Sequence, residues 1–354
     1  MKDLIIIDPY CPEESKKERL ESIVSYSVKG HSYERLTSVE EVENADLTGR
    51  RILFTLSLGQ SGINLNWYSI MKYLRLNKNA LEDSVGGVIL DGNCEVFTKS
   101  TGRSLVFTAN RAGCTFPGRP LVEGTRTLQN YNIQANNLHT DNIGAYMAAG
   151  KTLVENIMNY RNVRKEHPEI LVLHASSRRT SNSIAIWEMI KKHLPECTFN
   201  EISLRNGEIM DCRGCPYDVC RHFGEEEGCF YGGPITQKVY PGILSCDALM
   251  LLCPNYNDAL GANLTALVNR MTALFTTHRF YDKKLFGVVV SGYSGGDIVA
   301  EQLISGLNMN KTFALPGRFA ILETANNPGE ILHSEGIEER VQNFAYNMRK
   351  NLIK

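Results

Sequence analysis

The sequence has almost no excess charge and no long apolar run, and each absence excludes a class of protein. The formal net charge of its 354 residues is −1, so bulk electrostatics give no attraction to nucleic acid or to an anionic membrane. No segment approaches the roughly 18 consecutive apolar residues that a membrane-spanning helix requires. The apolar run in MKDLIIIDPY is too short for a signal peptide. We therefore predict a cytoplasmic protein with no nucleic-acid and no membrane partner.

Motifs of several enzyme classes are also missing. The sequence contains no Walker phosphate loop, no H-E-x-x-H zinc motif and no G-x-G-x-x-G dinucleotide fingerprint. Its eight histidines are scattered along the chain, and we name no catalytic acid or base. A hydrophobic content of 43% and a charged content of 22% are typical of a globular protein with a sizeable core. At this length we expect two domains.

What the sequence does contain is an alternation of apolar strands and amphipathic helices in both halves. In the first half we predict strands at Leu4–Asp8, Arg51–Thr55, Val88–Leu90 and Arg119–Val122. In the second half we predict them at Ile170–Leu173, Thr198–Leu204, Ala248–Leu252, Phe286–Val290 and Phe319–Leu322. Such alternation indicates βαβ units and a parallel sheet covered on both faces. Five strands with intervening helices fit a flavodoxin-like sheet, although strand order cannot be read from sequence.

The two halves also match each other. The tripeptide PGR occurs at 117–119 and again 199 positions later, at 316–318, and the pair Asn-Leu at 64–65 recurs 199 positions later at 263–264. We infer an internal duplication. The predicted fold class is α/β, with two tandem flavodoxin-like doubly wound parallel-sheet domains, and we place these domains at residues 1–165 and 166–354.

The loop after the strand at 170–173 carries the chemistry of an anion site. It reads ASSRRTSNS, from Ala175 to Ser183, and leads into a helix. Unpaired N–H groups at a helix N-terminus stabilise a phosphate, and hydroxyl and guanidinium groups can add hydrogen bonds. An ordinary serine N-cap is the alternative. The corresponding turn of the first half contains Asp8, Glu13 and Glu14, which would repel a phosphate, so we predict a degenerate N-terminal copy.

The second half, from about Ile170 to Lys354, resembles the NADPH-dependent FMN reductase and iron–sulfur flavoprotein family of flavodoxin-like proteins. Residues 175–183 resemble the family's phosphate loop, G-S-P-R-x-x-G-N-T, with alanine or serine at three of its positions. LCPNYNDALGANL (252–264) resembles the loop that passes along the flavin ring, and SGYSGGD (291–297) resembles the family's glycine-rich loop. The resemblance implies FMN-binding residues at Ser176, Arg178, Ser181, Asn182, Ser183, Pro254, Asn255, Tyr256, Asn257, Ser291, Gly292 and Gly295.

The implied function is that of an FMN-dependent NAD(P)H oxidoreductase or electron-transfer flavoprotein. NAD(P)H or a redox protein would donate electrons, and a small molecule or a protein would accept them. The alternative is a non-catalytic flavodoxin-like binding protein with a structural zinc in its cysteine-rich loop. Because family members generally dimerise near the flavin, we expect the two copies to form an internal pseudo-dimer. In that arrangement, residues 1–165 bind no flavin but wall the C-terminal site, and further homodimerisation stays open.

Four of the ten cysteines lie close together, as Cys212-x2-Cys215-x4-Cys220-x8-Cys229 in a turn-rich segment. This density suggests one metal or cluster, inserted into the second domain at residues 212–229. The resemblance implies a 4Fe–4S cluster, although the second and third gaps are wider than in the family's motif. Zinc in a four-thiolate site would use the same ligands, and reduced thiols without any metal are the third possibility.

Overall fold

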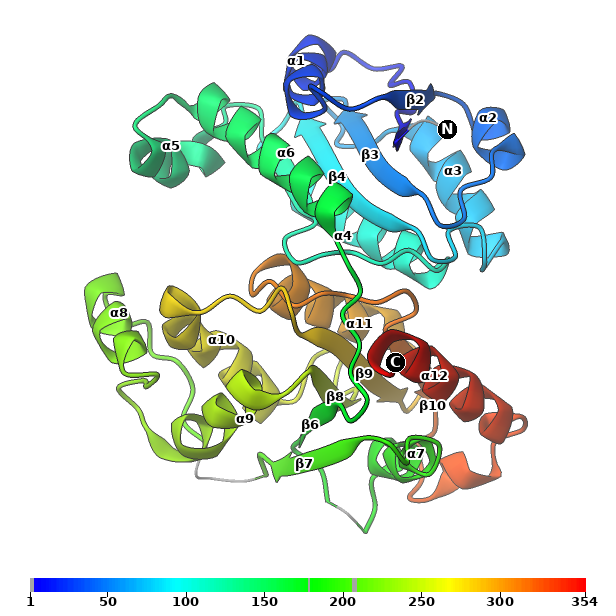
Figure 1. The fold of residues 1–354 in the computed structure, drawn as a ribbon, viewed down its shortest axis with the longest axis vertical. Helices are drawn as coiled ribbons and strands as arrows, with labels where there is room; N and C mark the ends of the chain where they lie inside the picture. The colour runs from blue at the N-terminus through cyan, green and yellow to red at the C-terminus, as the bar shows by residue number, and fades with distance from the viewer. Residues whose placement is uncertain (1–2, 178, 206–208) are drawn as a thin grey trace. The chain divides into compact units, whose positions relative to one another are not determined.

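The computed structural model describes residues 3–177, 179–205 and 209–354. The chain divides into two compact units, Met1–Arg161 and Asn162–Lys354, each built around one sheet (Figure 1). Within the described ranges, none of the helices combines the length and apolar character that crossing a bilayer demands.

The N-terminal unit is a five-stranded parallel sheet in the order β2-β1-β3-β4-β5. Its strands are β1 (Leu4–Ile7), β2 (Tyr33–Leu36), β3 (Arg51–Leu58), β4 (Val85–Gly92) and β5 (Leu121–Gly124). Its α-helices are α1 (Lys17–Ser27), α2 (Val39–Asn44), α3 (Leu65–Leu76), α4 (Thr98–Arg111), α5 (Asn132–Leu138) and α6 (Asn142–Asn159). Helices α1 and α6 pack together, as do α3 and α4. The sequence did not predict β2, because this partly exposed edge strand, YERL, has no apolar run.

The C-terminal unit has the same architecture, with the order β10-β9-β8-β6-β7. Its strands are β6 (Glu169–His174), β7 (Thr198–Ser203), β8 (Ala248–Pro254), β9 (Lys284–Ser291) and β10 (Ala320–Thr324). Its α-helices are α7 (Asn182–Lys191), α8 (Tyr217–Glu225), α9 (Tyr240–Ser245), α10 (Ala262–Thr277), α11 (Gly296–Leu303) and α12 (Ile337–Leu352). Numbered from its own first strand, each sheet runs 2-1-3-4-5, which is the flavodoxin-like order. The predicted fold class is confirmed.

Backbone geometry repeats between the two units at the offset of 199 residues. The amide of Val88 donates to Pro120 O (2.7 Å), and the amide of Gly287 donates to Phe319 O (3.0 Å). The arginine of each PGR tripeptide adopts a left-handed backbone conformation, with φ of 57° at Arg119 and 53° at Arg318. This conformation is uncommon for a residue other than glycine. Its recurrence at matching positions indicates a duplication that has kept local geometry as well as strand order.

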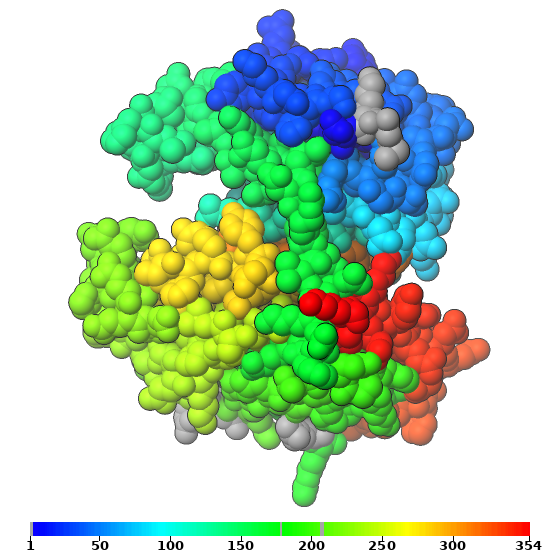
Figure 2. Space-filling model, viewed as in Figure 1, coloured from blue at the N-terminus to red at the C-terminus, as the bar shows by residue number. Residues whose placement is uncertain are grey.

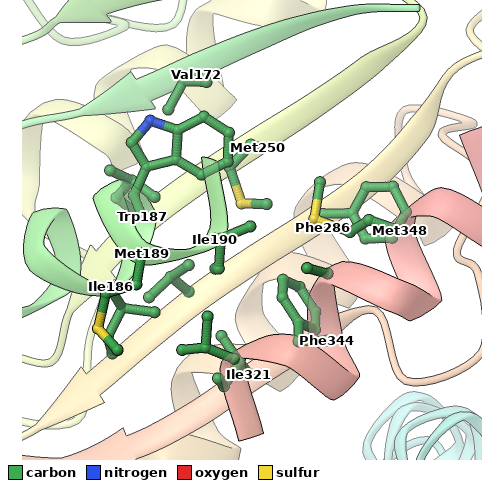
Figure 3. Packing of buried hydrophobic residues seen from close by; sticks show 14 of the residues in the cluster. Val172, Ile186, Trp187, Met189, Ile190, Met250, Phe286, Ile321, Phe344 and Met348 are labelled. Atoms are coloured by element: carbon green, nitrogen blue, oxygen red, sulfur yellow. The ribbon is translucent and has the colours of Figure 1, made fainter. Parts of the chain in front are cut away.

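A dense apolar core holds the C-terminal sheet rigid beneath its loops. Trp187 of α7 and Phe344 of α12 are buried in the same cluster as Met250 and Phe286 from the central strands (Figure 3). The indole Nε1 of Trp187 donates to Glu201 Oε1 at 3.1 Å, so the buried ring keeps its polar group satisfied. Because α7 is packed in this way, its N-terminus is fixed at the carboxyl edge of the sheet.

Lys284, at the start of β9, is a buried cation with a testable effect on stability. It is 4% exposed, and burial lowers its pKa from 10.5 to about 8. Its Nζ donates to Val163 O. Since the folded state disfavours the charged form, this penalty is fully present below pH 8 and disappears as the pH rises towards 10.5.

Lys284→Met is therefore expected to raise the free energy of unfolding at pH 7 by about 1–3 kcal/mol, the lost hydrogen bond offsetting part of the gain. The difference in free energy of unfolding between the variant and the wild type should be smaller at about pH 10. Urea unfolding of both proteins at pH 7 and at about pH 10 measures this difference. A difference that does not change with pH would contradict the assignment.

Candidate functional site

Loops from four strands of the C-terminal sheet enclose a cavity of about 550 Å³. The loops follow β6, β8, β9 and β10, whose carboxyl ends meet at one edge of the sheet, the usual ligand position in open α/β sheets. Of the residues named from the sequence, those that line the cavity are Ser176, Ser181, Asn182, Ser183, Pro254, Asn255, Tyr256, Asn257 and Gly292. Ser291 and Gly295 are not among the lining residues, and Arg178 falls outside the described residues.

The loop between β6 and α7 presents the N-terminus of α7 to the cavity. Ser181 is the N-cap, since its Oγ accepts a hydrogen bond from Ile184 N (3.3 Å). Ser181 Oγ and Ser183 Oγ lie 2.9 Å apart and share a hydrogen bond. By contrast, Ser176 Oγ is buried and has no hydrogen-bond partner within the part of the chain that the structure describes. An unsatisfied hydroxyl beside a helix N-terminus suits an anionic ligand.

Asn182 connects this loop to the one after β10. Its side chain is buried, and its Nδ2 donates to Asn327 O at 2.9 Å. Its Oδ1 accepts from Ile331 N at 3.4 Å. Asn182 thus lines the cavity, while its amide holds the α7 N-terminus against the neighbouring loop.

Asn255 connects the loops after β8 and β9 in a similar way. Its Nδ2 donates to Ser291 Oγ (3.1 Å), to Ser294 O (3.0 Å) and to Asp258 Oδ1 (3.2 Å). Ser291 therefore supports Asn255 from beside the lining residues. Asn255 Oδ1 is buried and has no partner among the described residues.

A tight turn brings Asp258 against the glycine-rich loop. Asn257 and Asp258 both have left-handed backbones, with φ of 54° and 57°, as the central residues of such a turn require. A Cβ added at Gly295 would lie 1.9 Å from Asp258 Oδ1, and Gly295 itself has a φ of 83°. Glycine is needed at this position so that the two loops can approach each other.

Ser177 and Thr180, hydroxyl donors of the predicted anion loop, also line the cavity. The sequence did not point to the other lining residues, namely Asp258, Val290, Tyr293, Ser294, Ala325 and Asn326. Tyr256 and Tyr293 are 61% and 84% exposed, so two phenol rings stand at the edge of the cavity. Ala325 and Asn326 follow a predicted strand, and that strand's carboxyl end was the signal that could have identified them.

The corresponding edge of the N-terminal unit is occupied by the chain's own side chains. The carboxylate of Glu13 accepts from Ser61 Oγ at 2.7 Å and 2.8 Å. The guanidinium of Arg19 donates to both oxygens of Asp91, at 2.9 Å and 2.7 Å, and to Thr125 O at 2.8 Å. The cavity beside this edge, lined by residues of α1, of β3 and of the loop that follows β1, has a volume of about 10 Å³, at most room for one water molecule.

The four clustered cysteines line a second cavity of the C-terminal unit, of about 240 Å³. The aromatic residues around it are Tyr217, Phe223, Phe230 and Tyr231. The sequence predicts a turn-rich segment, and the structure adds one helix to it: α8, which carries Cys220 and lies at the surface (Figure 2). Burial, with the other three thiols nearby, raises the pKa of Cys220. Among the described His, Cys, Asp and Glu side chains, no three are placed to hold a metal ion.

Comparison with known proteins confirms the predicted resemblance of the C-terminal half. Residues 168–327 match the family model described as NADPH-dependent FMN reductase. No curated protein matches the chain.

Similar solved structures each align with about half of the chain at low identity. An NADH:FMN oxidoreductase in its apo form has 13% identity and a TM-score of 0.37, covering 52% of this chain and 90% of that one. An NAD(P)H:quinone oxidoreductase from Methanothermobacter marburgensis has 17% identity and a TM-score of 0.35, and the match covers 52% of this chain and 99% of that one. An azoreductase from Bacillus anthracis has 14% identity and a TM-score of 0.36, and the match covers 52% of this chain and 97% of that one.

Proposed function

We propose that the protein is an FMN-dependent NAD(P)H oxidoreductase whose flavin site is the 550 Å³ cavity of the C-terminal unit. The observation that carries the proposal is the position of this cavity, at the carboxyl edge of a flavodoxin-like sheet and at the N-terminus of α7. The family match over residues 168–327 supports the same activity. Bound FMN supplies hydride and single-electron chemistry, while the protein sets its position and potential.

The residues of the cavity fit the two chemically different ends of FMN. The N-terminus of α7, with the hydroxyls of Ser176, Ser177 and Thr180, would hold the phosphate. The loops at 254–257 and 292–294 would border the ring with backbone amides and with the phenol rings of Tyr256 and Tyr293. Asn182 and Asn255 would keep these loops in register through the hydrogen bonds described above. No described side chain has to transfer a proton in this scheme.

The electron donor and acceptor follow from the family only in outline. We propose NAD(P)H as the donor, with a redox protein as the alternative, and a small molecule or protein as the acceptor. The cytoplasmic location, the pseudo-dimer and any further homodimer stay predictions from the sequence.

We further propose that the four-cysteine cavity holds a 4Fe–4S cluster. The support for this proposal is that all four thiols line the same 240 Å³ cavity, and that the family resemblance implies a cluster at this place in the sequence. Zinc, which four thiolates can also bind, is the alternative. Bound there, a cluster would add one-electron chemistry.

Titration of the full chain with FMN tests the main proposal. The protein should bind one FMN, quench its fluorescence, and oxidise NADH or NADPH when an electron acceptor is present. A protein that is colourless as purified and takes up no added FMN would refute the proposal. Iron and sulfide analysis tests the cluster separately: a yellow, flavin-loaded protein that cannot be reconstituted with iron would exclude the cluster and leave the flavin assignment intact.

A further inference from the structure

A buried arginine lines the four-cysteine cavity. Arg270 of α10 is 2% exposed, although its guanidinium carries a full positive charge. Its Nη1 donates to Met210 O at 3.2 Å and its Nη2 to Gly232 O at 2.6 Å. Its Nε has no hydrogen-bond partner within the described residues. No described carboxylate forms an ion pair with it.

A buried cation without an anion is unfavourable, because its desolvation is not offset by an opposite charge. The carboxylate of Asp211 is exposed and forms no ion pair with Arg270; its Oδ1 accepts from Asn269 Nδ2 (3.2 Å) and from Cys212 N (2.7 Å). The described residues that line this cavity include no aspartate or glutamate, so its wall can supply negative charge through the four thiols, which bind a metal as thiolates. Four thiolates around a cluster core of charge +2 leave a net charge of about −2 at the site, and a guanidinium in its wall would offset part of it.

We propose that Arg270 is the counter-charge of a metal–thiolate centre in the four-cysteine cavity, an inference that rests on the proposed cluster. In this role Arg270 is a positioning residue. It stabilises the loaded, anionic form of the cavity through its charge, and it makes the centre easier to reduce than it would be without a neighbouring cation.

The competing explanation is that Arg270 only ties the two ends of the cysteine segment to α10. Met210 precedes Cys212 and Gly232 follows Cys229, so the two hydrogen bonds of Arg270 bracket the segment. Lysine and glutamine separate the two explanations. Arg270→Lys keeps the charge but loses the fork of two parallel donors, whereas Arg270→Gln keeps a donor and loses the charge.

The experiment compares full-length wild type, Arg270→Lys and Arg270→Gln after anaerobic reconstitution with ferrous iron and sulfide. Wild type and Arg270→Lys should each retain about four irons per chain. Arg270→Gln should lose its iron to a chelator at least about tenfold faster. The reduction potential of the centre should be lowest in Arg270→Gln, with Arg270→Lys near wild type.

The proposal is overturned if wild type takes up no iron, or if lysine fails to restore iron retention and potential relative to glutamine. This second outcome includes the case in which both variants fail to fold, because the hydrogen bonds and not the charge would then be what the protein needs. FMN binding, measured on the same samples, separates this proposal from the flavin assignment. Retained iron with no FMN binding would refute the flavin site alone, and the reverse would refute the cluster and the role of Arg270.

Discussion

Replacing Ser177 with glutamate is expected to lower the affinity for FMN by at least about a hundredfold. Ser177 lines the cavity in the loop that precedes α7, and its carbonyl oxygen accepts from Thr180 N (3.3 Å) and Ser181 N (3.1 Å). A carboxylate there would stand beside the phosphate. Two like charges about 4 Å apart repel by about 4 kcal/mol at an effective dielectric constant of 20, which is more than the hundredfold loss requires.

Fluorescence titration of FMN with the wild type, Ser177→Glu and the matched control Ser177→Ala measures this effect. Alanine removes one hydroxyl donor and should cost about tenfold or less. The glutamate effect should weaken as salt is added, because salt screens a partly exposed charge. If Ser177→Glu lowered the affinity for FMN no more than Ser177→Ala does, the phosphate would have to bind elsewhere. The N-terminal unit already has a carboxylate, that of Glu13, at its corresponding edge.

Removing the guanidinium of Arg19 is expected to destabilise the N-terminal unit by about 3–5 kcal/mol, the usual effect of leaving a buried charge unpaired. Asp91 is fully buried, and Arg19 donates to both of its carboxylate oxygens. Burial raises the pKa of Asp91 from 3.8 to about 6, even though the hydrogen bond and charge of Arg19 act to lower it. In Arg19→Ala the carboxylate would keep the desolvation penalty and lose its partner.

The pH dependence gives this second prediction its sharpest test. With a folded pKa above the unfolded value, Asp91 binds a proton more readily in the folded state, so its contribution to stability falls as the pH rises from 4 to 6. Losing Arg19 raises the folded pKa further. The cost of Arg19→Ala should therefore be large near pH 8 and smaller near pH 5, where Asp91 is neutral.

Urea unfolding of the N-terminal transition at the two pH values measures this cost. The double variant Arg19→Met/Asp91→Leu is the matched control, because it removes both charges and should recover most of the stability lost by Arg19→Ala. A cost below about 1 kcal/mol at pH 8, or one independent of pH, would mean that the ion pair contributes little.

Much of the fold and part of the site could be predicted because the relevant signals are local. Buried parallel strands are apolar runs, and the strands at 170–173, 248–252 and 286–290 were found in this way. The PGR repeat revealed the duplication, because a short turn must keep its residues to keep its backbone angles. The three site loops could be identified for the same reason: helix N-termini and tight turns require particular residues at particular spacings.

Other features depend on partners that are distant in the chain. Strand order, the role of Gly295 beside Asp258, and the Arg19–Asp91 pair across 72 residues are set by packing. Asn182 and Ser291 are predicted as ligand residues from their motifs, and only the fold shows the hydrogen bonds by which they also support neighbouring loops. Helix α8 was not predicted, because its segment is rich in turn-forming and charged residues. In the folded protein this helix packs against α10.

The class of fold, its duplication and the three loops of the candidate flavin site were therefore predictable from local patterns in the chain. Only packing brings these loops around one cavity in the second copy, while side chains of the first copy fill the corresponding edge. Packing also places Arg270 in the wall of the four-cysteine cavity. The physical reason is that periodicity and turn chemistry act between neighbours in the chain. Burial, by contrast, brings together charges and hydrogen-bonding groups whose spacing in the sequence carries no signal.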